Sequence, residues 1–399
     1  MYSIQTIVKK LHFGTNIFLG VSFKMFSDEA KFIKTEKVLV VSKLSKYEHE
    51  KIRHKNLSEQ ELEALIRNRG TDYEKLIHHH ELHNRFKENV VSTLRNMGCE
   101  VEVVNRLNYT EDKVEKADVI VPTGGDGTFL LAASKVKDNK KPVIGFNSDP
   151  NRSEGYLCLP KKYSTDIRGA IEKLQMGKFD WLMRSRIRTT LMVSEEENLT
   201  PIYLHGIDAE DSIPECSCSI SGVKILPVLA LNEVFMGEKL AAKVSHLQMR
   251  LNGSTQMTNL KCSGICVSTG TGSTSWHLSI NRLPAQSVAE LLRLIDIDAT
   301  EGKDSLATIL SEIYNKNLIF PPDDKRMGYT IRELISAGVW PQPKGIKPRG
   351  FATKVEVKSN CFDASLVIDG GVSFNFNDGA IALLEVFPED ALRTVVLKD

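Results

Sequence analysis

Three glycines and one aspartate stand between a predicted strand and a predicted helix. In VIVPTGGDGTFLLAASK (119–135) the apolar run ends at Gly124, and a helical run begins at Phe129. Glycines let the backbone approach a ligand closely, and the N–H groups at a helix start favour an anion such as phosphate. A carboxylate repels phosphate unless it holds Mg²⁺ or accepts a proton from an attacking hydroxyl. Gly124–Thr128 therefore predicts phosphoryl transfer, and the alternative is a tight turn with Asp126 as helix N-cap.

Two further polar stretches lie in the second half of the chain. TGTGSTSW (269–276) supplies many hydrogen-bond donors and little bulk, which suits a nucleotide lying against the backbone. On composition alone, however, this stretch is a polar turn. The pair Asn232-Glu233, within LALNEV, stands in a predicted strand and has little specificity by itself.

Composition excludes several classes of partner. The 399 residues carry 52 Lys+Arg and 51 Asp+Glu, so the net charge of +1 steers the chain neither toward nucleic acid nor toward an anionic membrane. No apolar run approaches the ~20 residues that span a bilayer. We expect no nucleic-acid partner and no membrane partner.

The seven cysteines do not form a disulfide framework, because they are odd in number and scattered. The close pairs Cys216/Cys218 and Cys262/Cys266 lack zinc-ribbon spacing. The pattern predicts reduced thiols in an intracellular compartment and no dedicated metal cluster.

The first residues have the composition of a mitochondrial transit segment. No acid precedes Asp28, and one helical face carries Ile4, Ile7, Val8 and Leu11, with Lys9 and Lys10 off it. The segment contains no arginine, and the alternative is a disordered start in a cytoplasmic protein. We predict residues 1–30 as a transit segment and the mitochondrial matrix as the location.

The N-terminal part predicts an α/β domain over residues 31–180. Its predicted strands are 37–43, 101–103, 117–121 and 142–147, and helical patterns separate them. Helices begin at two predicted capping boxes, Ser58–Glu61 and Thr71–Glu74, and a further helix covers 129–136. Alternating strands and helices indicate a parallel sheet with flanking helices and a crevice at the strand ends.

Short strand-like runs predict a β-rich domain over residues 181–375. These runs are 191–194, 226–237, 246–253, 264–273, 352–358, 365–371 and 373–379. One helical insert, 287–315, interrupts them. We expect the tail, 376–399, to return to the N-terminal domain.

In order and combination, the three polar motifs resemble those of the NAD kinase family. Gly124–Thr128 resembles its GGDGT signature, which the phosphofructokinase and lipid kinase families share in variant form. The stretch 269–276 resembles its T-P-T-G-S-T-A-Y, with Gly270, Ser275 and Trp276 replacing Pro, Ala and Tyr. Asn232-Glu233 stands where the family carries Asn-Glu.

The resemblance is closer to the mitochondrial branch of that family and covers most of residues 37–399. GFNSDPNRSEGYLCLP (145–160) resembles the loop of that branch, and LNEVF, TGTGS, VIDGG and FNDGAIA follow in the same order. The implied fold is an NAD kinase-like α/β domain plus a β-rich domain. The implied assembly is a homodimer that helps to complete the site.

The resemblance implies an ATP-dependent kinase that phosphorylates the adenosine-ribose 2′-hydroxyl of NAD⁺ to give NADP⁺. Asp126 is implied as the general base or orienting carboxylate. The donor phosphates, with Mg²⁺ held by those phosphates, are implied to lie on Gly124, Gly125, Gly127 and Thr128.

The implied NAD-binding residues come from both halves of the chain. Asn232 and Glu233 hold nucleotide hydroxyls. The adenosine end contacts Thr274, Ser275 and Ser279, and the adenine-side loop supplies Asn147 and Tyr156.

Two departures from the family pattern bear on the nicotinamide half. Ser263-Gly264 stands where most members carry Asp-Gly, and Gly371 replaces a Gln. For Asp369 two roles stay open, a ligand contact and a turn former. The choices between NAD⁺ and NADH, and between ATP and polyphosphate, also stay open.

Two rivals remain at this point. A lipid kinase shares GGDGT, but such enzymes usually carry a further acidic-Asn pattern after the loop, whereas here Phe129–Ser134 follows. An NAD-binding sensor without catalysis is supported by the Ser263 departure, and the intact Asp126 argues against it.

Two clusters are predicted to be surface features. His78–His83 offers two histidines on one helical face without a third ligand, which predicts a solvated helix face. Arg184-Ser-Arg186-Ile-Arg188 predicts a strand on a solvent edge, although it could reach phosphates. Arg152 is the better candidate for a phosphate partner.

Overall fold

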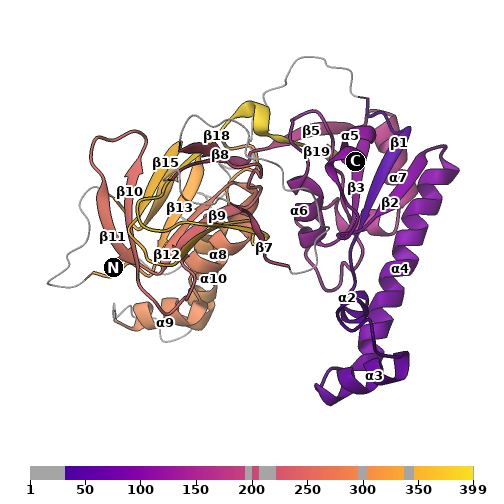
Figure 1. Cartoon of the computed structure of the whole chain (residues 1–399), viewed down its shortest axis with the longest axis horizontal. Helices are drawn as coiled ribbons and strands as arrows, with labels where there is room; N and C mark the ends of the chain where they lie inside the picture. The colour runs from indigo at the N-terminus through magenta and orange to yellow at the C-terminus, as the bar shows by residue number, and fades with distance from the viewer. Residues whose placement is uncertain (1–31, 194–199, 206–221, 295–302, 337–345, 399) are drawn as a thin grey trace. The chain divides into compact units, whose positions relative to one another are not determined.

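The computed structural model describes residues 32–193, 200–205, 222–294, 303–336 and 346–398 (Figure 1). The predicted transit segment, 1–30, and the pair Cys216/Cys218 lie outside these residues. The chain divides into two compact units, each with most of its contacts inside itself. One unit contains the helical segment Asn281–Leu318, and the other contains Phe32–Ile280 and the residues after Leu318. Each unit is described by itself.

The N-terminal part alternates strands and helices. Its strands are β1 (Lys37–Ser42), β2 (Glu100–Val104), β3 (Val119–Gly124) and β4 (Phe146–Asn147). Its helices are α2 (Lys46–Arg53), α3 (Glu59–Asn68), α4 (Tyr73–Asn96), α5 (Glu111–Lys116), α6 (Asp126–Ser134), the 3₁₀ turn η2 (Lys161–Ser164) and α7 (Ile167–Gln175).

The four strands form a parallel sheet in the order β2-β1-β3-β4. The central strands read KVLVVS and VIVPTG and are buried almost throughout, as expected for a parallel sheet covered on both faces. On one face, Val90 and Leu94 of α4 and Ile171 of α7 share a core with β1 and β3. On the other face, Phe129 and Ala132 of α6 share a core with the same strands. Figure 1 shows α4 running along this sheet.

The remaining strands are mostly antiparallel. They are β5 (Phe179–Arg184), β6 (Ile187–Met192), β7 (Ile202–Tyr203), β8 (Val223–Ile225), β9 (Glu233–Glu238), β10 (Ser245–Leu251), β11 (Thr258–Cys262), β12 (Gly264–Ser268), β13 (Met327–Arg332), β14 (Arg349–Ala352), β15 (Lys354–Ser359), β16 (Ala364–Ile368), β17 (Val372–Asn375), β18 (Ile381–Val386) and β19 (Leu392–Leu397). The short helical elements among them are η3 (Thr271–Thr274), α8 (Trp276–Asn281) and η4 (Pro388–Asp390).

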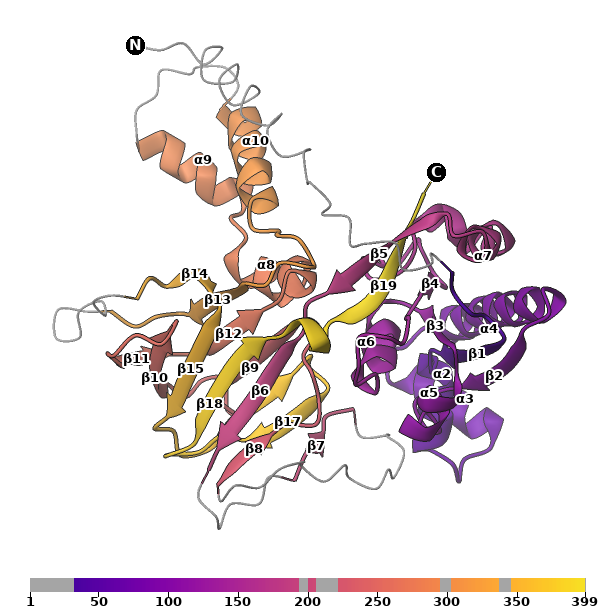
Figure 2. The same cartoon turned by 90° about the horizontal axis from the view of Figure 1, so that it is seen from above.

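Two antiparallel sheets enclose one apolar core. Their orders are β11-β10-β15-β18-β6-β8 and β14-β13-β12-β9-β16-β17-β7. Alternate residues, such as Leu247 and Met249 of one sheet and Val234 and Met236 of the other, point into this core. Figure 2 shows β15, β18, β6 and β8 side by side.

The last strand of the chain pairs with the strand that enters the β-rich part. β19 runs antiparallel to β5, with Leu392 opposite Arg184. Arg393 also forms a parallel bridge with Pro142, in the segment that leads into β4. The end of the chain therefore fixes β5 next to the parallel sheet.

The helical unit consists of α9 (Ala285–Leu294) and α10 (Lys303–Lys316). Val288 and Leu292 of α9 pack on Leu306 and Ala307 of α10, and Figure 2 shows the two helices together. The hydroxyl of Ser311 donates to the carbonyl of Leu283 (2.6 Å), which holds the hairpin at its base.

Helix starts follow local capping chemistry, with one correction. The predicted capping box at Ser58–Glu61 is confirmed by the start of α3. The box predicted at Thr71 is wrong, because the N-cap of α4 is Asp72, whose carboxylate accepts from the N–H of Lys75 (2.9 Å). A further box, Ser45 with Glu48, begins α2.

Candidate active site

The glycine turn joins β3 directly to α6. A Cβ on Gly124 would lie 2.3 Å from Oγ1 of Thr128, so a side chain does not fit there. A Cβ on Gly127 would meet no atom within 4 Å, so packing does not require glycine at that position. Gly125 is the N-cap and has no side chain to satisfy the first N–H groups of α6. The N–H of Thr128 donates to the carbonyl of Gly125 (3.0 Å), so the N–H groups of Asp126 and Gly127, with the helix dipole, are the ones available to an anion.

Asp126 is the first residue of α6, and its carboxylate is held by a different loop. One oxygen accepts from the N–H of Leu157 (2.9 Å) and the other from the N–H of Tyr156 (3.2 Å). The alternative of a turn capped by Asp126 is wrong, because Gly125 is the N-cap and no side chain caps this helix. Each carboxylate oxygen can accept a second hydrogen bond, so a substrate hydroxyl can still be bound.

Asn147 shapes the loop that holds Asp126. Its side chain is buried, its Nδ2 donates to the carbonyl of Ser153 (2.9 Å), and its Oδ1 accepts from the N–H of Asp149 (3.1 Å). Gly155 has φ of +65°, and a Cβ there would lie 2.4 Å from Nδ2 of Asn147. Tyr156 is 57% exposed at the end of this loop. Of the two predicted loop residues, Tyr156 is the one open to a ligand.

Asp369 organises the backbone of the Asn-Glu pair. Its Oδ2 accepts from the N–H of Leu231 (2.7 Å), and its Oδ1 accepts from the N–H groups of Asn232 (2.8 Å) and Glu233 (3.0 Å). Asp369 has φ of +49°, a left-handed conformation that Asp tolerates better than most residues. Of the two roles left open for Asp369, the geometry supports a structural one.

The two carboxyl groups next to each other titrate differently. Burial and then the charge of Asp369 raise the pKa of Glu233 to about 8. Burial raises the pKa of Asp369 only to about 6, because three backbone N–H groups and the cation of Arg186 favour its charged form. Near neutral pH, Asp369 is therefore ionised and Glu233 is protonated, so Glu233 can donate a hydrogen bond.

Each residue of this pair has one buried side-chain oxygen without a partner among the described residues. Neither Oδ1 of Asn232 nor Oε2 of Glu233 has a hydrogen-bond partner among the described residues. Buried polar atoms are normally satisfied in folded proteins, and the exceptions often mark functional sites. Nucleotide hydroxyls would satisfy both atoms.

The TGTGS turn is bonded onto the Asn-Glu pair. The N–H of Thr269 donates to the carbonyl of Asn232 (2.9 Å), and Nδ2 of Asn232 donates to Oγ of Ser275 (3.3 Å). The hydroxyl of Thr274 donates to the carbonyl of Thr271 (3.3 Å), and that of Ser279, in α8, donates to the carbonyl of Ser275 (3.2 Å). The structure thus brings Ser275 to the Asn-Glu pair and leaves Thr274 and Ser279 in local bonds.

One core joins these two groups of residues. Leu231, immediately before Asn232, packs in the same buried cluster as Phe129 and Leu157. Phe129 belongs to α6, and the N–H of Leu157 binds Asp126. The glycine turn and the Asn-Glu pair are therefore placed against one another.

The prediction that Arg184–Arg188 forms a solvent-edge strand is wrong for two of its arginines. Arg184 is 9% exposed and Arg186 is 1% exposed. Arg186 donates to the carbonyls of Val136 (2.5 Å) and Asp390 (2.5 Å), so it binds the chain just beyond the end of α6. A single sequence gives no signal for this burial, because alternating cations look the same on an exposed strand.

The histidine cluster also departs from its prediction. His83 is buried, and its Nε2 lies 3.1 Å from Oγ of Ser42. Burial lowers the pKa of His83 to about 4, so the ring is neutral at physiological pH. Throughout the described part of the chain, no group of three or more His, Cys, Asp or Glu could hold a metal ion.

Ser263, the departure from the family pattern, has a carboxylate beside it. Its hydroxyl donates to the side chain of Glu333, and its N–H donates to the carbonyl of Arg332 (3.0 Å). A carboxylate distant in sequence therefore lies beside Ser263.

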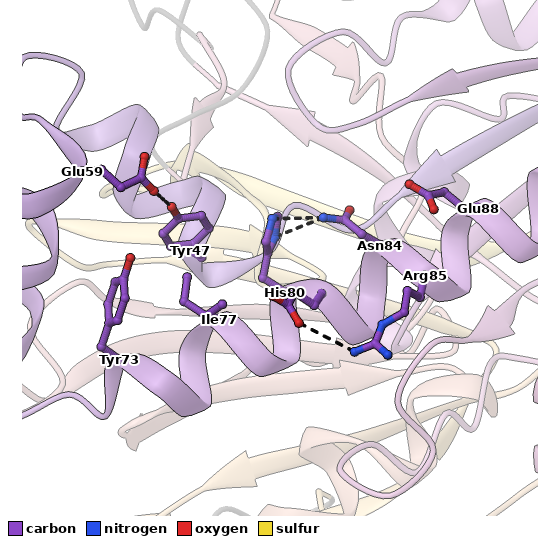
Figure 3. A pocket seen from close by; sticks show the side chains of 9 residues that line it. Tyr47, Glu59, Tyr73, Ile77, His80, Asn84, Arg85 and Glu88 are labelled. Atoms are coloured by element: carbon purple, nitrogen blue, oxygen red, sulfur yellow. Dashed lines mark hydrogen bonds and ion pairs between the residues drawn. The ribbon is translucent and has the colours of Figure 1, made fainter.

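A shallow hollow of about 670 Å³ lies elsewhere, among α2, α3 and α4 (Figure 3). Its lining residues are Tyr47, Glu59, Tyr73, Ile77, His80, Glu81, Asn84, Arg85 and Glu88. The hydroxyl of Tyr47 is bonded to Glu59, and Nδ1 of His80 is bonded to Oγ of Ser45 (2.8 Å). None of the predicted site residues lines this hollow, so the proposed chemistry does not involve it.

A glycine turn at a helix start, a held carboxylate and buried polar side chains on one core fit a phosphotransferase that acts on a hydroxyl group. The sequence model of the family "ATP-NAD kinase N-terminal domain" matches residues 32–157 of this chain. "NAD kinase 2, mitochondrial" of Xenopus tropicalis is 39% identical over 96% of this chain and 95% of that protein. The human protein of the same name is 39% identical over 91% of this chain and 84% of that protein.

The chain therefore belongs to the NAD kinase family and to its mitochondrial branch. Among solved structures, an NAD kinase from Archaeoglobus fulgidus in complex with ATP has a TM-score of 0.49 and 19% identity, covering 91% of this chain and 93% of that one. No helix among the described residues is long and apolar enough to cross a membrane.

Proposed function

We propose that this NAD kinase transfers the terminal phosphoryl group of ATP to the 2′-hydroxyl of the adenosine ribose of NAD⁺, giving NADP⁺ and ADP. The new bond joins the ribose oxygen to phosphorus, and the bond from phosphorus to the β,γ-bridging oxygen breaks. The hydroxyl proton goes to the carboxylate of Asp126. The observation that carries this proposal is the position of Asp126 between the open N-terminus of α6 and the loop of Tyr156 and Leu157.

The donor and the acceptor would use different parts of the site. The N–H groups of Gly125, Asp126 and Gly127 would bind donor phosphates, which develop charge during transfer, whereas the N–H of Thr128 already donates to the carbonyl of Gly125 (3.0 Å). Asn232, Glu233 and Ser275 would bind nucleotide hydroxyls through their unpaired or weakly paired atoms. Tyr156 is exposed enough to contact an adenine ring.

Mg²⁺ fits this site as an ion that is bound mainly by the phosphates of the donor ATP. Asp126 is the carboxylate at the glycine turn, and no larger acidic group lies there among the described residues. When bound through the donor phosphates, the ion would neutralise charge on their oxygens.

The rival functions are distinguished by two observations. Family membership favours NAD over a lipid as the acceptor. The Ser263 departure supported an NAD-binding sensor without catalysis. That support is weaker in the structure, because Glu333 provides a carboxylate beside Ser263. The experiment is NADP⁺ or NADPH formation with ATP or polyphosphate and NAD⁺ or NADH in all pairings. Binding of NAD⁺ without any product would favour the sensor.

The role of Asp126 is tested by Asp126→Asn. Loss of general-base help lowers kcat by about 10²–10⁴-fold, whereas the fold and much of the NAD⁺ affinity remain. The control is Asp112→Asn, because Asp112 also lies in the first turn of a helix, α5, but outside the site. Near-full turnover of Asp126→Asn would refute the role.

We further propose residues 1–30 as the transit segment and a homodimer as the assembly. A fusion of residues 1–36 to a fluorescent reporter tests import, and a diffuse cytosolic signal contradicts it. Exposed apolar residues on β7 and β8, namely Ile202, Tyr203, Val223 and Ile225, support an interface. Light scattering that finds a monomer at micromolar concentration would contradict the dimer.

A further inference from the structure

Arg184 is a buried cation at the end of β5. Its strand is paired through Leu392 of β19, and its side chain is only 9% exposed. Burial of a guanidinium costs several kcal/mol unless a counter-charge or hydrogen bonds offset that cost. A buried arginine therefore needs a partner.

The partners that the structure provides do not use the whole guanidinium. Nη1 donates to Oγ1 of Thr271 in the TGTGS turn (3.3 Å). Nε is buried and has no hydrogen-bond partner in the described part of the chain. A guanidinium has five N–H donors, so most of the donor capacity of Arg184 remains for another group.

Arg184 lies close to the glycine turn, because Leu392, its partner on β19, packs in the same buried cluster as Phe129 of α6 and Leu157. Burial lowers its pKa to about 10, while the nearby Asp126 and Cys158 raise it, so the side chain stays charged at neutral pH. Cys158 lies at the same turn, with its Sγ 3.8 Å from the carbonyl of Gly124. Among the described residues, the hydrogen-bond partner of the Arg184 side chain is the hydroxyl of Thr271 and not a carboxylate. The positive charge of Arg184 therefore lies near Asp126 and can still bind a second anionic group.

An uncompensated aspartate beside a phosphate site is unfavourable, since both groups are negative. Two like charges in contact repel more strongly in a partly buried site than in water, because the effective dielectric constant is lower there. A buried cation near the carboxylate offsets this repulsion. The guanidinium is also planar and matches a phosphoryl oxygen pair better than an ammonium does.

We propose that Arg184 is the counter-cation of the phosphoryl-transfer site, joining the TGTGS turn to the glycine turn and binding a phosphoryl oxygen of the donor next to Asp126. This assignment rests on the proposed function and adds a residue to it. It explains why a strand that enters the β-rich part ends in a buried arginine at Thr271.

The test compares Arg184→Gln and Arg184→Lys with the control Arg188→Gln. Arg188 follows closely in the chain but pairs with Asp390 (2.7 Å), away from Thr271. The measurements are kcat, the KM values for ATP and NAD⁺, and calorimetric binding of inorganic tripolyphosphate to the full-length protein. Circular dichroism and thermal unfolding verify that each variant is folded.

Loss of a charge-assisted hydrogen bond predicts a rise of about 10–100-fold in the KM for ATP and in the Kd for tripolyphosphate in Arg184→Gln. The KM for NAD⁺ should stay within about threefold. Arg184→Lys keeps the positive charge but not the planar set of N–H donors of a guanidinium, so its affinity for ATP and tripolyphosphate should lie between those of Arg184→Gln and the wild type. Arg188→Gln should match the wild type.

Two results would overturn the proposal. One is unchanged tripolyphosphate and ATP affinity in Arg184→Gln, or, if that variant does not fold, in Arg184→Lys. The other is a selective loss of NAD⁺ affinity, which would assign Arg184 to the acceptor. A wild-type protein that binds tripolyphosphate through Arg184 but makes no NADP⁺ would instead refute the proposed function.

Discussion

Replacement of Asp369 by asparagine tests how the Asn-Glu pair is held. The carboxylate accepts three backbone N–H groups, from Leu231, Asn232 and Glu233. The asparagine carbonyl can keep the two bonds now made by Oδ1, but its NH₂ group would face the N–H of Leu231. Asparagine tolerates φ of +49° as well as aspartate does, so backbone strain does not confuse the result.

The expected cost follows from the lost bond. A buried hydrogen bond to a charged acceptor contributes about 1.5–3 kcal/mol, and the unpaired N–H adds a desolvation penalty of similar size. The ionised carboxylate is itself costly to bury, which offsets part of this sum. We expect Asp369→Asn to lower the free energy of unfolding by about 2–4 kcal/mol and to raise the KM for NAD⁺.

The assay is urea unfolding at pH 7.5, followed by tryptophan fluorescence, since Trp276 stacks on Phe235 near the site (ring centroids 4.6 Å apart). The matched control is Asp363→Asn. Asp363 forms an exposed ion pair with Lys239 (2.7 Å), and its loss should cost less than about 0.5 kcal/mol. Equal stability of Asp369→Asn and the wild type would refute the structural role.

Three further predictions concern neighbouring groups. Gly127→Ala should leave the free energy of unfolding within about 0.5 kcal/mol of the wild type, because the added Cβ meets no atom within 4 Å. The same substitution should weaken ATP binding. Unchanged ATP affinity in calorimetry would show that Gly127 is not part of the phosphate site. The folded-state pKa of Glu233 is raised from 4.5 to about 8, so its contribution to stability is full below about pH 4.5 and is lost as pH rises through about 8. Across that range the free energy of unfolding of the wild type should fall by on the order of 3–5 kcal/mol relative to Glu233→Gln. Parallel stability–pH curves from urea titrations would contradict this. Arg186→Met should destabilise the fold by about 3 kcal/mol or more, because the carbonyls of Val136 and Asp390 lose their buried donor; a thermal midpoint equal to that of the wild type would show that these carbonyls find other partners.

The elements of the parallel sheet could be predicted because their signals are local. The apolar runs of β1 and β3 and the capping box at Ser58 depend on neighbouring residues alone. The predicted strand 142–147 contains β4, which has only two residues. The edge strand β7 also has two residues, too few for any periodic pattern. Their positions depend on pairing with distant strands.

The glycine turn could be found from the sequence because its chemistry is contiguous. The role of Arg184 could not, since it depends on Thr271 being brought to the end of β5. The same holds for Asp369, whose three partners lie 136–138 residues earlier in the chain. A pattern of alternating arginines predicts exposure unless the fold supplies acceptors, and here the carbonyls of Val136 and Asp390 do so.

The pairing of β19 with β5 has a consequence for the order of events after synthesis. The ribosome, or an import channel that threads the amino terminus first, releases Leu392–Leu397 after β5 and Pro142. Until those residues arrive, the strand that ends in Arg184 lacks its neighbour, and the segment at Pro142 lacks its bridge to Arg393. A chain that lacks Leu392–Leu397 would therefore leave β5, and Arg184 at its end, without the strand that holds them next to the parallel sheet.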